Sequence, residues 1–97
     1  MQGTGMTICI LGAGAFGTAL AIALSETHDI RLWGRNANTA AKMEVRRENS
    51  KLPGAVLGPN ITVTSDAKAA IQSADFILSA IPLQSTRAAL ENLTQYF

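Results

Sequence analysis

The chain has 97 residues, of which 47% are hydrophobic and 15% are charged. This balance excludes a disordered chain, and the length allows one domain of ordinary size. Eight basic and seven acidic residues give a net charge of +1, which lacks the basic excess typical of nucleic-acid-binding domains. A single cysteine excludes an internal disulfide.

The first part of the chain is free of charged side chains as far as Glu26. A membrane span needs about 20 largely uninterrupted apolar residues, and three glycines interrupt this stretch, so we expect no span. We expect residues 1–5 to form a flexible lead-in. Residues 6–11 are typical of a strand buried in a parallel sheet, and the alanine- and leucine-rich residues 16–25 favour a helix.

The same alternation continues in the middle of the chain. Residues 28–33 predict a second strand. Residues 38–48 predict a helix that Asn38 or Thr39 can cap and whose charged side chains cover a solvated surface. Residues 49–60 are dense in proline and glycine, which predicts a loop.

The last third predicts two further units. Residues 61–64 are β-branched and favour a strand, and Ser65 or Asp66 can cap a short helix that reaches about residue 73. Residues 75–81 (DFILSAI) predict another buried strand.

Pro82 ends this strand, and residues 85–93 return to a helical pattern. Strands that alternate with helices predict an α/β fold with a parallel sheet.

A glycine motif follows the first predicted strand directly and opens the first predicted helix. Its glycines are Gly12, Gly14 and Gly17 in the pattern G-x-G-x-x-G. The first glycine permits a tight turn, the second lets the backbone approach a pyrophosphate, and the third lets the helix pack closely on the sheet. This context predicts a dinucleotide site in a Rossmann-type doubly wound sheet, truncated after about four strands. The alternative is that the glycines serve only a close turn.

The end of the second strand bears on the choice of cofactor. Sites that prefer NAD usually place an acidic residue about 20 residues after the glycine motif. Here Gly34, Arg35 and Asn36 follow the strand, and no acid is present. Arg35 can pair with a 2′-phosphate or stack on adenine, or it can be an ordinary exposed arginine. Pro82 should lie across the same crevice, near the centre of the cofactor, unless it only starts a helix.

Several segments together resemble one family. GAGAFGTALA, RLWGRN, RREN with LPG, and LGPNITVTSD occur in this order and resemble the NAD(P)-dependent glycerol-3-phosphate dehydrogenases of bacterial type, over about residues 7–93. The resemblance implies reduction of dihydroxyacetone phosphate to sn-glycerol 3-phosphate with NADH or NADPH, for phospholipid synthesis. It implies that Ala15 and Phe16 touch the cofactor and that Arg35 lies at its adenosine end. The family often has Ser in place of Ala15, and Trp or Tyr in place of Phe16.

The resemblance also implies a division of labour. Residues 6–97 would form a partial NAD(P)-binding domain, whereas the substrate lysines and a helical substrate domain would lie downstream. We therefore assign no catalytic residue and no metal ligand, and we expect the 97-residue chain alone to be inactive. The single cysteine favours a reducing cytosol, so we expect a cytoplasmic protein. A homodimer is possible, and the choice between NADH and NADPH stays open.

Two alternative functions remain at this point. A ketopantoate-reductase-like or other 2-hydroxy-acid dehydrogenase would share the glycine motif but should lack the REN…LPG segment. A non-catalytic nucleotide-sensing module would often carry an acid at the second strand end, where this chain has Gly34 and Arg35.

Overall fold

A computed structural model of the chain describes residues 5–81. Pro82 and the helix expected over residues 85–93 lie outside this range. Within it, strands and helices alternate as expected, and most boundaries lie within two residues of the predicted ones. The elements are β1 (Thr7–Leu11), α1 (Ala15–Leu24), β2 (Asp29–Trp33), α2 (Ala37–Arg46), β3 (Ile61–Thr64), α3 (Ala67–Ile71) and β4 (Phe76–Ser79).

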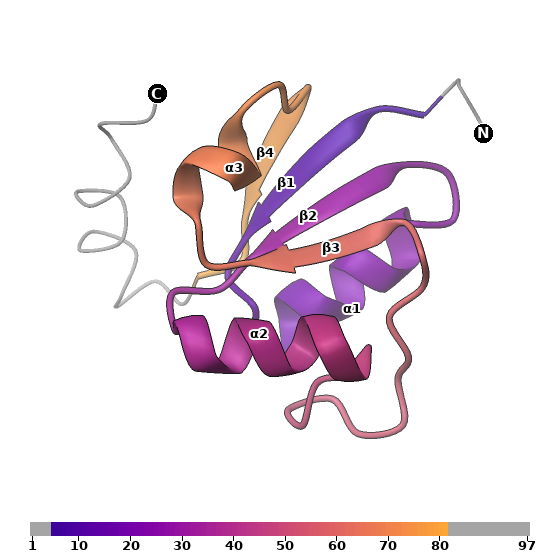
Figure 1. The fold of residues 1–97 in the computed structure, drawn as a ribbon. Helices are drawn as coiled ribbons and strands as arrows, with labels where there is room; N and C mark the ends of the chain where they lie inside the picture. The colour runs from indigo at the N-terminus through magenta and orange to yellow at the C-terminus, as the bar shows by residue number, and fades with distance from the viewer. Residues whose placement is uncertain (1–4, 82–97) are drawn as a thin grey trace.

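The four strands form one parallel sheet in the order β3-β2-β1-β4. The chain runs outward from β1 through β2 to β3 and then returns to the other side of β1, as Figure 1 shows. The strand order therefore reverses between β1 and β4. This arrangement confirms the predicted doubly wound sheet, in which ligands bind beyond the carboxyl ends of the strands at such a reversal.

Helices cover both faces of the sheet. In Figure 1, α1 and α2 lie on one face and α3 lies on the other. The core under α1 and α2 includes Ile10, Leu32 and Met43, whereas the smaller core under α3 includes Trp33 and Ala70. No helix within residues 5–81 has the length and apolar character required to cross a bilayer.

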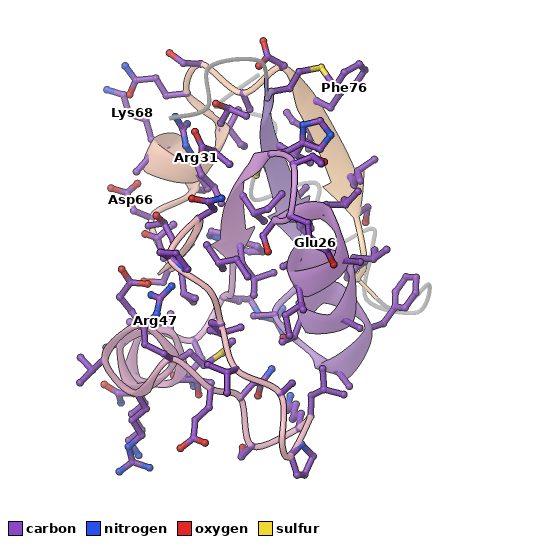
Figure 2. The ribbon with its side chains drawn as sticks, turned by 90° about the vertical axis from the view of Figure 1, so that its right-hand side faces the viewer. Glu26, Arg31, Arg47, Asp66, Lys68 and Phe76 are labelled. Atoms are coloured by element: carbon purple, nitrogen blue, oxygen red, sulfur yellow. The ribbon has the colours of Figure 1, made fainter. Side chains whose placement is uncertain are left out.

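β4 is the element whose environment was predicted wrongly. Its run of apolar residues predicted a buried strand, but all four of its residues are exposed, with Phe76 at 54%. The reason is position, because within residues 5–81 β4 pairs only with β1 and its residues belong to neither core cluster. Phe76 projects from this strand in Figure 2.

The caps of the helices are only partly as expected. Asn36, and neither Asn38 nor Thr39, caps α2, because its Oδ1 accepts a hydrogen bond from the backbone N–H of Thr39 (3.0 Å). Asp66 caps α3 as predicted, through a bond from the N–H of Ala69 (3.2 Å).

Two charged residues of the α2 segment contact the outer edge of β3 and do not simply face solvent. Glu44 Oε1 accepts a hydrogen bond from the backbone N–H of Val63 (2.9 Å) and pairs with Arg47 (2.7 Å). Arg47 in turn donates to the carbonyl oxygens of Gly58 (2.7 Å) and Ile61. Two side chains from one segment therefore satisfy backbone groups on the side of β3 that faces away from β2.

Arg31 anchors α3 to the sheet. It lies beside α3 in Figure 2, and its Nη1 donates to the carbonyl oxygens of Ala69 (3.2 Å) and Gln72. A cation at the carboxyl end of a helix also opposes the negative end of the helix dipole.

Cys9 is fully buried in β1, as expected. Burial raises the pKa of its thiol from 9.0 to about 11, and the nearby Arg31 guanidinium opposes this shift.

We expect iodoacetamide at pH 8 to leave Cys9 unmodified in the folded protein and to alkylate it in urea, which mass spectrometry would show. In the unfolded chain the Cys9 thiol has its ordinary pKa of 9.0, which is lower than in the folded protein. The contribution of this thiol to stability is therefore complete below about pH 9 and is lost as the pH rises towards 11. Rapid alkylation under native conditions would contradict this account.

Candidate functional site

A cleft of about 510 Å³ opens at the carboxyl edge of the sheet, where the strand order reverses. Four parts of the chain line it: the loop after β1 with the start of α1, the end of β2 with the start of α2, Lys51 from the loop after α2, and the end of β4. The lining residues are Gly12, Ala13, Gly14, Ala15, Phe16, Trp33, Gly34, Arg35, Asn36, Thr39, Ala40, Lys51, Ala80 and Ile81.

Two of the motif glycines are required by the fold. Gly12 has a φ of +115°, and a Cβ there would lie 3.0 Å from the carbonyl carbon of Ala80. A Cβ on Gly17 would collide with the carbonyl oxygen of Gly12. These positions turn the chain sharply out of β1 and bring α1 against the sheet, as the motif predicts.

Gly14 differs from both, because a Cβ there would meet nothing within 4 Å. Its φ of −79° is one that any residue adopts. The protein's own packing therefore does not require a glycine at this position. Gly14 also lines the cleft, so the absence of a side chain there leaves its backbone open to a ligand.

The start of α1 offers hydrogen-bond donors to that ligand. The first bond within the helix runs from the N–H of Thr18 to the carbonyl oxygen of Gly14 (3.0 Å), so the N–H groups of Ala15, Phe16 and Gly17 precede it. The first turn contains no acidic residue. These N–H groups and the positive end of the helix dipole favour a phosphate.

Phe16 stands at the mouth of the cleft with 66% of its surface exposed. Ala15 is also exposed there. An exposed aromatic ring that lines a cleft offers apolar surface to a ligand.

The end of β2 brings Arg35 and Asn36 to the glycine loop. A Cβ on Gly34 would lie 3.0 Å from the Cβ of Ala13, so the small residue allows this close approach. Arg35 lines the cleft, is exposed, and makes no hydrogen bond or ion pair with the other residues of the 5–81 range. Asn36 also lines the cleft, although its Oδ1 is engaged in capping α2.

The end of β4 forms the opposite wall, as predicted from the strand order. Ala80 and Ile81 line the cleft, and the N–H of Ala80 donates to the carbonyl oxygen of Leu11 (2.7 Å). Pro82, the residue predicted to contact the cofactor here, lies outside the described residues.

Sequence reasoning missed three residues at the site. Thr39 and Lys51 line the cleft, and Asn49 is buried behind the glycine loop. The RREN…LPG segment contains both Asn49 and Lys51 and could have indicated them. It contributed to the family resemblance, but no function was assigned to its residues. Lys51 lies in residues 49–60, which were predicted only as a loop.

Lys51 adds a second cation to the cleft besides Arg35. We expect Lys51→Met to weaken dinucleotide binding about two- to fivefold at low salt and less at high salt, because exposed charges are screened. Calorimetric affinities at two salt concentrations would measure this, with Lys68→Met on α3 as a control. An equal loss in both variants would show that only net charge matters.

Comparison with known proteins adds the family. Residues 7–97 match the family model described as NAD-dependent glycerol-3-phosphate dehydrogenase N-terminus. The chain is 45% identical over 86 residues to a glycerol-3-phosphate dehydrogenase [NAD(P)+] of Chelativorans sp., covering 87% of this chain and 26% of that protein. It is 47% identical over 91 residues to the enzyme of that name from Roseobacter denitrificans, covering 93% of this chain and 28% of that protein.

A solved structure agrees with these sequence relatives. The crystal structure of a glycerol-3-phosphate dehydrogenase from Coxiella burnetii superposes with a TM-score of 0.89 at 25% identity, over 96% of this chain and 29% of that one. The chain thus spans little more than a quarter of the length of the relatives it matches. By its sequence and its fold, the chain belongs to the family of the NAD-dependent glycerol-3-phosphate dehydrogenase N-terminus.

Proposed function

We propose that this chain binds NAD(P)H as part of an oxidoreductase that reduces dihydroxyacetone phosphate to sn-glycerol 3-phosphate. The observation that carries the proposal is the open space at Gly14, where a ligand can reach the start of α1 inside the cleft. A pyrophosphate suits this position, because it needs backbone donors and close approach without a Cβ.

The residues assigned to the candidate site would serve different parts of a bound dinucleotide. Gly12, Gly14 and Gly17 shape the loop that would receive the pyrophosphate, and Ala15 and Phe16 would contact it from the start of α1. Arg35 and Asn36 would lie at the adenosine end. Ala80 and Pro82 would lie towards the centre of the cofactor.

When bound, NAD(P)H would supply a hydride to the ketone carbon of the substrate. This chain's own residues would bind and orient the dinucleotide. We place the groups that bind and polarise dihydroxyacetone phosphate outside this chain, which spans 26–28% of the relatives compared above. Residues 6–97 would then form part of the NAD(P)-binding domain of a cytoplasmic enzyme of phospholipid synthesis.

Two measurements on the full-length protein test this function. Calorimetry should show binding of NADH or NADPH, and nicotinamide absorbance should fall when dihydroxyacetone phosphate is added. Absence of dinucleotide binding would overturn the proposal. Binding without turnover of this substrate would instead favour another dehydrogenase or a nucleotide-sensing module.

A further inference from the structure

Asn49 is a buried polar residue that contacts the candidate cofactor site from behind. Only 3% of its surface is exposed, and it follows α2 by three residues. Its Nδ2 donates to the carbonyl oxygen of Ala13 in the glycine loop (3.0 Å) and to Thr18 Oγ1 in α1 (2.7 Å). Its Oδ1 accepts a hydrogen bond from the N–H of Lys51 (3.0 Å).

All the hydrogen-bonding atoms of this side chain are therefore used, and each connects to a different part of the site. Ala13 belongs to the loop that shapes the cleft, Thr18 lies in the first turn of the helix that follows, and Lys51 lines the cleft from the loop after α2. A buried amide with every group satisfied holds its partners in one arrangement, because an unmade bond there would leave a desolvated polar group.

The bond to Ala13 has a direct consequence for ligand binding. Ala13 stands between Gly12, which turns the chain out of β1, and Gly14, where the cleft is open. With its carbonyl oxygen held by Asn49, the peptide between Ala13 and Gly14 has a fixed orientation. The Gly14 N–H belongs to that same peptide plane.

We propose that Asn49 is a positioning residue for the dinucleotide: it fixes the glycine loop in the orientation that receives the pyrophosphate and holds the backbone of Lys51, which also lines the cleft. The inference rests on the proposed function of the cleft. It goes further by assigning cofactor affinity to a buried side chain that does not itself line the cleft.

The test compares Asn49→Ala with two controls in the full-length protein. Asn60→Ala removes the same kind of bond at the other end of α1, where Asn60 Nδ2 donates to the carbonyl oxygen of Ser25 (3.0 Å). Thr18→Val removes the second partner of Asn49 but leaves the bond to Ala13. Asn49→Ser provides a second variant with a hydroxyl in the same space, in case Asn49→Ala does not fold.

We expect Asn49→Ala or Asn49→Ser to lower the affinity for NADH or NADPH about tenfold in calorimetry, which corresponds to roughly 1.4 kcal/mol of binding free energy. Asn60→Ala should stay within about twofold of the wild type, and Thr18→Val within about threefold. In steady-state assays, the KM for the dinucleotide should rise while kcat changes less than about twofold. Circular dichroism during thermal unfolding would establish the folded fraction of each variant.

The contrary outcomes are distinct. If kcat falls at constant KM, Asn49 serves only folding, because a smaller folded population lowers the number of active sites without changing their affinity. If Thr18→Val weakens binding as much as Asn49→Ala, the effect runs through helix packing. Unchanged affinity in a folded Asn49 variant overturns the inference alone, whereas a wild-type protein that binds no dinucleotide overturns the proposed function and this inference with it.

Discussion

Replacing Gly14 with valine is expected to abolish dinucleotide binding and to leave the fold intact. Within residues 5–81, no atom of another part of the chain lies within 4 Å of the position a Cβ would take, and the φ of −79° suits any residue. We therefore expect the chain to fold with valine at this position. The valine would instead occupy the space that we assign to the pyrophosphate. We expect at least a hundredfold loss of affinity by calorimetry, with an unchanged circular dichroism spectrum.

Gly58 provides the control for this variant. A Cβ there also meets nothing within 4 Å, but Gly58 lies in the loop before β3 and does not line the cleft. Gly58→Val should therefore keep full affinity. Retained binding in a folded Gly14→Val variant would show that the pyrophosphate lies elsewhere.

Arg35 is expected to discriminate between the two cofactors. A charge-assisted hydrogen bond contributes about 1.5–3 kcal/mol, so Arg35→Ala should weaken the binding of NADPH by roughly ten- to a hundredfold. NADH lacks the 2′-phosphate and should lose far less. Arg35→Asp should favour NADH outright, because a carboxylate repels the phosphate. Calorimetric affinities for both cofactors, at one salt concentration, measure the effect.

Arg46→Ala is the matched control, because this exposed arginine of α2 does not line the cleft. It should change neither affinity. If Arg35→Ala lowers the affinity for both cofactors equally, the guanidinium stacks on adenine and does not bind the 2′-phosphate. If it weakens neither, the discriminating group lies elsewhere.

Local patterns were sufficient to predict the elements and the glycine turn that joins β1 to α1. The apolar run of β1, the glycines that follow it and the small residues of α1 are contiguous in sequence, and each has a local steric meaning. The structure accordingly gives Gly12 a positive φ and places Gly17 against the backbone of the β1 exit.

Features that depend on distant partners could not be predicted in this way. An apolar run such as that of β4 indicates a strand but does not reveal whether the strand lies at the edge of the sheet, which depends on pairing order. Asn49 contacts Ala13, 36 residues earlier in the chain, and no local pattern marks that contact. The cap of α2 was displaced by two residues for a simpler reason, because three neighbouring polar residues compete for it and only Asn36 has the extended backbone of a cap.

The contacts of Glu44 and Arg47 with β3 have a consequence for self-association. A strand from another molecule would continue the sheet beyond β3 by bonding to the outward backbone groups of Ile61 and Val63. The side chains of Arg47 and Glu44 already occupy two of these groups, the carbonyl oxygen of Ile61 and the N–H of Val63. Fibril growth by strand addition requires two free edges on every molecule, one to receive a neighbour and one to be received. The contacts of Glu44 and Arg47 therefore oppose the addition of a strand at β3.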